Sequence, residues 1–156
     1  MAMERIQRTI GEVLGEHSWP ELAPTASVAE AVEAMARDGV DCVLVVEDGR
    51  ISGVFTARDF LHRIAGAQLL PAQVALADVM TRNPVVLQRE HCITYAINCM
   101  ATRNIRNVPV VDDAGRPVGV LRVWDVIAHL SDVFEEIAQV PPDDASSDMW
   151  VDLGGG

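Results

Sequence analysis

Apolar residues recur along the chain first in a helical pattern and then in a strand-like one. Over Val28–Met35 they return every three or four residues, which predicts a helix with one buried face. Ser27 and Glu30 have the spacing of a capping box at its start, and Gly39 suits the left-handed position that ends a helix. The next run, Cys42–Val46, is continuous and rich in β-branched residues, as in a strand covered on both faces.

A hairpin and a second helix are expected to complete this unit. Glu47–Arg50 is a polar turn that contains glycine, and apolar positions resume over Ile51–Phe55. The pattern then predicts a helix over about Ala57–Ile64. The unit is therefore a helix, a strand hairpin and a helix.

The same unit occurs twice. Sliding the chain on itself by 65 to 66 residues aligns SVAEAVEAMARDGVDCVLVVEDGRISGVFTARD with CITYAINCMATRNIRNVPVVDDAGRPVGVLRVWD. The second repeat is thus predicted to have a helix that ends at Asn104, strands over Val108–Val111 and Pro117–Leu121, and a helix over Val123–Leu130. One unit leaves sheet and helix faces uncovered, so the two repeats are expected to pack on each other.

Short aligned segments precede the repeats, and we call Thr9–Leu14 and Ala75–Met80 the first and second pre-repeat segments. The order of elements suggests an N-terminal helix with the first repeat over residues 1–72, the second repeat over 73–131 and an acidic tail over 132–156. SDVFEEIAQV predicts a short helix, and PPDDASSDMWVDLGGG has a disordered composition. Met149–Val151 is either a docking element or an incidental apolar spot.

Charge and hydropathy bear on the partners and the compartment. The net charge is −11, with seven acidic and no basic residues over 132–152, which disfavours nucleic acid as a partner. All twelve basic residues are arginines, whose planar donors suit phosphate oxygens. No apolar run is long enough to span a membrane, and charges interrupt the N-terminus where a signal peptide would be apolar, so a cytoplasmic protein is expected.

Motifs for metal binding or catalysis are missing from the sequence. The three cysteines form no CxxC pair and the four histidines lack ligand spacing, so Cys42 and Cys99 are expected in the core rather than in a metal site. There is no P-loop, no paired-carboxylate motif and no nucleophile beside a base. We therefore expect a protein that is not an enzyme and requires no cofactor.

The strings LADVMTRNPVVL, NVPVVDDAGRPVGVL and GVFTARDFL resemble the CBS domain pair, or Bateman module, and the resemblance covers about residues 9–130. It implies an α+β fold of two pseudo-twofold-related β-α-β-β-α repeats packed sheet to sheet. It also implies that AMP, ADP or ATP binds between the repeats as a regulatory ligand and transmits a conformational change to a regulated partner or across a homodimer interface.

Gly53–Asp59 matches the family's nucleotide signature of Gly, two residues, Thr or Ser, two residues and Asp. The Asp59 carboxylate could accept both ribose hydroxyls and Thr56 could donate toward phosphate, but the same pair could simply cap a helix. The resemblance implies that Val85 and Val108 flank the adenine and that Arg106 reaches a phosphate. The full set for this main cleft is Val54, Phe55, Thr56, Arg58, Asp59, Val85, Arg106, Asn107 and Val108.

The mirror cleft departs from the signature. Asp125 is retained, but Arg122 replaces the Thr, and Asp41 occupies the position of the phosphate-binding Arg106, where it would repel phosphate. This cleft is expected to be the weaker one, and its set is Pro20, Asp41, Cys42, Arg122 and Asp125. Two alternatives stay open: S-adenosylmethionine as the ligand, or a dimerisation scaffold that binds no small molecule.

Overall fold

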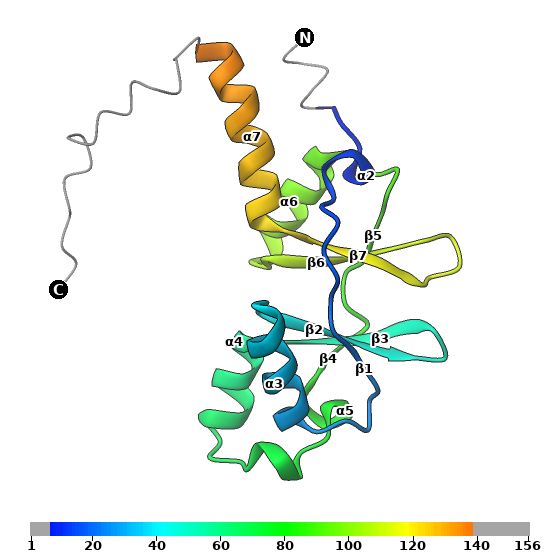
Figure 1. Cartoon of the computed structure of the whole chain (residues 1–156), viewed down its shortest axis with the longest axis vertical. Helices are drawn as coiled ribbons and strands as arrows, with labels where there is room; N and C mark the ends of the chain where they lie inside the picture. The colour runs from blue at the N-terminus through cyan, green and yellow to red at the C-terminus, as the bar shows by residue number, and fades with distance from the viewer. Residues whose placement is uncertain (1–6, 139–156) are drawn as a thin grey trace, which may run out of the picture.

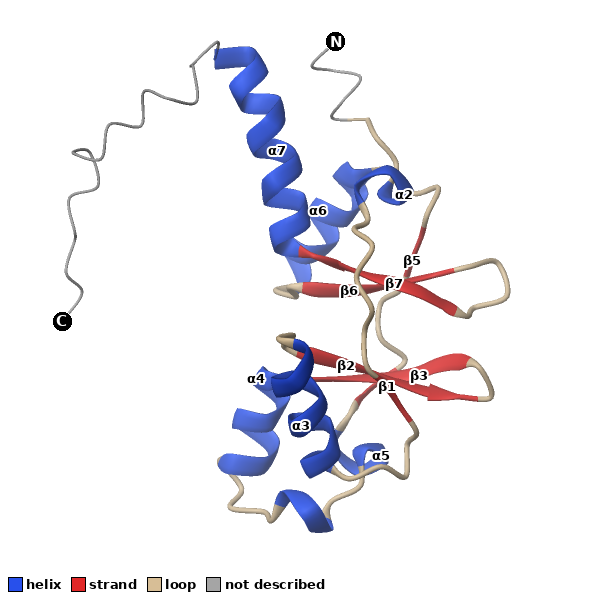
Figure 2. Cartoon of the chain, viewed as in Figure 1, coloured by secondary structure: helices blue, strands red, loops and turns tan. Residues whose placement is uncertain are grey.

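The computed structural model describes residues 7–138, which form two α+β units stacked with their sheets facing each other and their helices outside (Figures 1 and 2). The first sheet has the order β1 (Glu21–Leu22), β2 (Cys42–Glu47), β3 (Arg50–Thr56) and β4 (Thr81–Arg82). The second has the order β5 (Leu87–Gln88), β6 (Asn107–Val111) and β7 (Pro117–Arg122). In each unit a short parallel strand flanks the antiparallel hairpin.

The helical segments are α2 (Ile10–Val13), α3 (Val28–Asp38), α4 (Ala57–Asp59), α5 (Leu76–Val79), α6 (Ile93–Arg103) and α7 (Val123–Ala138), with a π-helical segment η1 (Phe60–Ala65) and a 3₁₀ turn η2 (Pro71–Gln73). The predicted caps are confirmed. The Ser27 hydroxyl accepts the amide of Glu30 at 3.2 Å, and α3 and α6 end at left-handed Gly39 (φ 65°) and Asn104 (φ 51°).

The helices that follow the hairpins differ from the sequence prediction. In the first repeat α4 continues as η1, where the amide of Gly66 bonds to the carbonyl of Leu61, five residues back. In the second repeat, one helix spans Val123–Ala138, where a helix to Leu130 and a separate short helix were expected. Neither Gly nor Pro interrupts this stretch, so nothing local ends the helix at Leu130.

Each pre-repeat segment packs into the core of the repeat that it does not directly precede. Ile10 of α2 is fully buried in the core of the second repeat, and Leu76 of α5 is fully buried in the core of the first. Backbone hydrogen bonds hold both segments in place. The amide of Ile10 donates to the carbonyl of His91 at 2.8 Å, and the amide of Leu76 donates to the carbonyl of Ala26 at 2.8 Å. Each folded unit therefore combines one repeat with the pre-repeat segment that precedes the other repeat in the chain.

Glycines in the hairpins make room for the exchanged segments. A β-carbon on Gly53 would lie 2.4 Å from the sulfur of Met80, and one on Gly119 would lie 3.0 Å from a methyl group of Leu14. The two glycines occupy corresponding strand positions, and each faces the segment that precedes the other repeat. Absence of a side chain thus permits close packing of both pre-repeat segments.

A third apolar cluster joins the two sheets. Cys42 and Leu44 of β2 and Val120 of β7 are almost completely buried there, with Trp19 and Val54 packed beside them. This cluster confirms the expected sheet-to-sheet packing of the repeats. It also brings the first residues of β2 and β6 together at one edge of the molecule, on the left of Figure 1.

Candidate functional site

The signature residues of the first repeat lie opposite the α6–β6 loop of the second. The guanidinium of Arg58 on α4 donates to the carbonyl of Asn104 at 3.4 Å, which spans the two repeats. The amide of Ala57 donates to the carbonyl of Asp41 at 2.9 Å, which ties the start of α4 to the start of β2. Residues from both repeats therefore meet at this edge.

Thr56 and Asp59 form a capping box at the start of α4. The carboxylate accepts the amide and the hydroxyl of Thr56 at 3.0 and 2.9 Å, and the amide of Asp59 donates back to that hydroxyl at 3.2 Å. Arg63 contacts the other carboxylate oxygen at 3.2 Å. The helix-capping interpretation of this pair is thus realised, and the carboxylate remains partly accessible, with 14% of the side chain exposed.

The apolar members of the main-cleft set differ in burial. Phe55 and Val108 are fully buried in the cores of the first and second repeats, so their side chains are not exposed at the edge between the repeats. Val54 is partly buried in the cluster between the sheets, and Val85 lies two residues before β5, packed against the second core. Val85 therefore precedes β5, which begins at Leu87.

The polar members from the second repeat remain accessible. Arg106 is exposed, and Asn107 is partly exposed at the start of β6. The side-chain amide of Asn107 donates to the carboxylate of Asp41 at 2.9 Å, so a residue assigned to the main cleft bonds to one assigned to the mirror cleft. The two sets of cleft residues therefore meet at the bond between Asn107 and Asp41.

In the mirror cleft, Arg122 folds back onto Asp125. Its Nε lies 3.0 and 3.2 Å from the two carboxylate oxygens, its Nη2 contacts Oδ1 at 2.5 Å, and its backbone amide also donates at 2.9 Å. Burial raises the pKa of Asp125, but the hydrogen bonds from Arg122 outweigh burial and leave the pKa below its usual value. Both groups are charged at neutral pH.

Of the other mirror-cleft residues, Pro20 and Cys42 are buried, whereas Asp41 is exposed. Pro20 accepts the amide of Leu44 through its carbonyl at 3.0 Å, which pairs the chain before β1 with β2. Burial, with a smaller contribution from the neighbouring Asp41 carboxylate, raises the pKa of the Cys42 thiol to about 12. Cys42 is therefore a protonated core side chain, and Cys99 is buried as well, as the sequence predicts.

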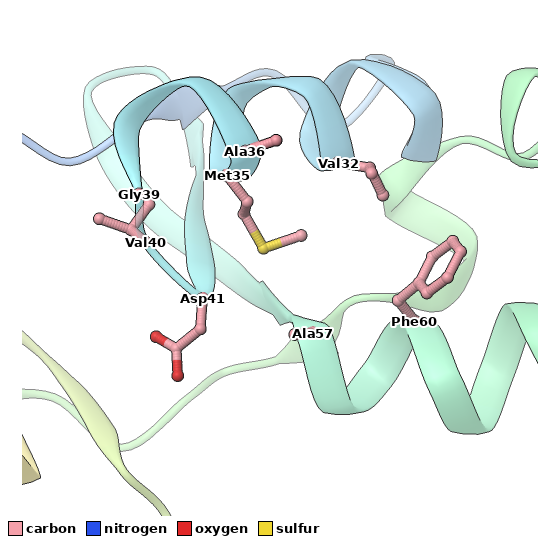
Figure 3. A pocket seen from close by; sticks show the side chains of 8 residues that line it. All are labelled: Val32, Met35, Ala36, Gly39, Val40, Asp41, Ala57 and Phe60. Atoms are coloured by element: carbon pink, nitrogen blue, oxygen red, sulfur yellow. The ribbon is translucent and has the colours of Figure 1, made fainter.

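An apolar pocket of about 310 Å³, which sequence reasoning missed, opens between α3 and α4 (Figure 3). Its lining residues are Val32, Met35, Ala36, Gly39, Val40, Asp41, Ala57 and Phe60. Ala36 and Ala57 contribute only small side chains to this lining, and Gly39 contributes none. The same small residues are compatible with an ordinary helix contact, so the sequence alone did not signal a pocket.

Residues 7–138 hold neither a cluster of metal ligands nor a helix that could span a membrane. No group of three or more His, Cys, Asp or Glu side chains in that range is arranged to hold a metal ion. Every helix in the same range is too short or too polar to cross a membrane.

Known families and structures resemble this chain over both repeats. The family model described as CBS domain matches residues 20–66 and again 76–132. The meiotically up-regulated gene 70 protein of Schizosaccharomyces pombe is 35% identical over 130 residues, which cover 83% of this chain and 18% of that protein. An arabinose 5-phosphate isomerase of Francisella tularensis is 29% identical, with coverage of 81% and 37%. The chain therefore spans well under half of these two relatives.

Solved structures share the fold. A CBS domain protein from Pyrobaculum aerophilum, complexed with AMP, superposes with a TM-score of 0.72 at 24% identity, over 85% of this chain and 99% of that one. The CBS domain pair of protein MJ0100, in complex with 5′-methylthioadenosine and S-adenosyl-L-methionine, has a TM-score of 0.72 at 21% identity, with coverage of 81% and 98%. With its duplicated family match and this fold, the chain belongs to the CBS domain family and carries two repeats.

Proposed function

We propose that this chain is a regulatory module that binds one adenosyl ligand, an adenine nucleotide, between its repeats and is not itself an enzyme. The ligand lies in the cleft of Thr56 and Asp59, and its binding alters the contact between the repeats. The regulated protein is another chain or another part of a longer one. A ligand shifts such an equilibrium only by its difference in affinity between the two arrangements.

The observation that carries this proposal is the meeting of α4 with the α6–β6 loop. Arg58 reaches the carbonyl of Asn104 across the repeats, so the signature motif of one repeat lies beside the polar loop of the other. Asp59 supplies carboxylate oxygens for ribose hydroxyls, while Arg58 and the exposed Arg106 supply donors for a phosphate. Val54 and Val85 offer partly buried apolar surface for the base.

The related structures support an adenosyl ligand without choosing among its forms. One was solved with AMP and another with 5′-methylthioadenosine and S-adenosyl-L-methionine. The arginines at this edge favour a ligand that carries phosphate over one that carries a sulfonium group, because guanidinium groups pair with phosphate oxygens. We therefore place AMP, ADP and ATP ahead of S-adenosylmethionine.

Asp59→Ala should abolish the response to nucleotide. The intact chain is expected to gain about 2.7 kcal/mol of stability at a nucleotide concentration 100 times Kd, and the variant should gain none. Thermal unfolding with AMP, ATP and S-adenosylmethionine, combined with calorimetric titration, measures this difference. The substitution also removes a helix cap, which costs about 0.5–2 kcal/mol of stability without ligand.

Glu30→Ala is the matched control, because Glu30 fills the same capping position at the start of α3 and bonds to Ser27 at 2.7 Å. It should lose comparable stability and keep the full response to ligand. If neither protein responds to any of the three compounds at millimolar concentration, the chain is a scaffold without a small ligand. Equal responses in Asp59→Ala and the intact chain would place the ligand elsewhere.

We also propose that the chain forms a homodimer through the exposed faces of α7 and η1. Trp124 and Phe134 on α7 are 69% and 61% exposed, and Leu61 in η1 is 63% exposed, so large apolar side chains are exposed on helices of both repeats. Trp124→Asp should shift a dimer toward monomer in analytical ultracentrifugation. Leu70→Asp, a control at an equally exposed leucine beside η2, should leave the mass unchanged. A monomer in the unsubstituted protein would contradict the dimer.

A further inference from the structure

The two repeats cap their last helices in the same way but with different side chains. The amide of Thr56 donates to Asp59 at 3.0 Å, and the amide of Arg122 donates to Asp125 at 2.9 Å. β3 ends at Thr56 and β7 ends at Arg122, so the two positions correspond. The backbone cap therefore does not require the arginine.

The two carboxylates differ in how many of their oxygens a guanidinium contacts. Arg63 contacts only one oxygen of Asp59, at 3.2 Å, and the same guanidinium also donates to the carbonyl of Val79 and the hydroxyl of Thr81. The guanidinium of Arg122, in contrast, contacts both oxygens of Asp125 through Nε and Nη2 at 2.5–3.2 Å. The second oxygen of Asp59 accepts only the neutral amide and hydroxyl of Thr56, at 3.0 and 2.9 Å, so Asp125 alone of the two has a charged donor on both oxygens.

One further group contacts Arg122, and a second attracts its charge. Its Nη2 lies 2.9 Å from Nε2 of His17, in the chain that leads to β1. The hydrogen bonds to Asp125 raise the pKa of Arg122, and attraction to Asp41 of the first repeat adds to the rise. The guanidinium therefore sits among two carboxylates and an imidazole, which match its charge and its donors.

We propose that Arg122 acts as a built-in occupant of the mirror cleft, so that the chain binds a single adenosyl ligand and Arg122 sets this stoichiometry. The proposal rests on the proposed function, since it assumes that a carboxylate at this position binds ribose when no guanidinium covers both of its oxygens. Ribose hydroxyls and the guanidinium are all donors that compete for the same two oxygens. The Arg122 guanidinium binds these oxygens in preference to ribose, because its charge-assisted, bidentate bonds are stronger than those of neutral hydroxyls. It also belongs to the same chain, so no ligand has to be immobilised.

Arg122→Thr tests the inference, because it gives the second repeat the cap of the first. The decisive comparison is between Asp59→Ala and the double variant Asp59→Ala/Arg122→Thr in calorimetric titrations with AMP and with 5′-methylthioadenosine. The second probe is included because it carries no phosphate for Asp41 to repel. The single variant should bind neither compound, and the double variant should bind one molecule of at least one of them per chain.

The number of ligand molecules bound per chain, measured in proteins that retain Asp59, gives a second test. The intact chain should bind one molecule per chain, and Arg122→Thr should raise this to two for at least one probe. Arg116→Thr is the control, since it removes an exposed arginine that pairs with Asp112 at 2.8 Å outside the cleft, and it should leave one site. Thermal unfolding of each variant checks that the fold persists.

The outcomes separate this inference from the proposed function. Two molecules bound by the intact chain, or no site gained on replacing Arg122, would overturn the role of Arg122 and leave the Asp59 cleft untouched. A site gained in Arg122→Thr by a chain that otherwise binds nothing would instead refute the Asp59 cleft and support the role of Arg122.

Discussion

Ile10→Ala is expected to destabilise the second repeat by about 2–5 kcal/mol, although Ile10 precedes the first repeat in the chain. Its side chain is fully buried beside Leu87 and Ile93, so truncation leaves a cavity in that core. The backbone bonds of Ile10 to His91 and of Ile93 to Arg8 do not involve the side chain and should keep the segment in place.

Native-state hydrogen exchange locates this loss. Amides of β6 and β7 should exchange faster in Ile10→Ala than in the unsubstituted protein, while amides of β2 and β3 should change much less. Denaturant unfolding gives the overall free energy for comparison. Faster exchange mainly in β2 and β3 would show that α2 stabilises the repeat it precedes, contrary to the structure.

Leu76→Ala is the reciprocal change and should destabilise the first repeat by about 2–5 kcal/mol. Leu76 is fully buried in the core with Val28, Val43 and Phe55, although it lies directly before the second repeat in the chain. Faster exchange is therefore expected in β2 and β3. The two variants together should give opposite exchange patterns, which a general loss of stability would not produce.

The control for Leu76→Ala is Leu70→Ala, six residues earlier in the chain. Leu70 is 62% exposed, so the same truncation there removes little buried area and should change the free energy of unfolding by less than about 0.5 kcal/mol. A comparable loss in both variants would mean that the segment is sensitive to any change. The burial of Leu76 would then not explain its effect.

The candidate site was predictable in part. The Thr56–Asp59 spacing identified a helix start and a motif, but the same residues suited a cap and a ligand, and the structure shows that they do form the cap. For the cleft with Arg122 the sequence predicted only weaker binding. The folding of Arg122 back onto Asp125 depends on the side-chain rotamer and on His17, which lies 105 residues away in the chain.

The sequence by itself determined the repeat, the α3 and α6 caps and the four hairpin strands, because these depend on local periodicity and on residues a few positions apart. Only the tertiary structure decided that the pre-repeat segments exchange partners. α2 and α5 are four residues long, too short to be stable alone, so their position depends on which core accepts Ile10 and Leu76. The pairing of Asn107 with Asp41 depends in the same way on how the two sheets meet.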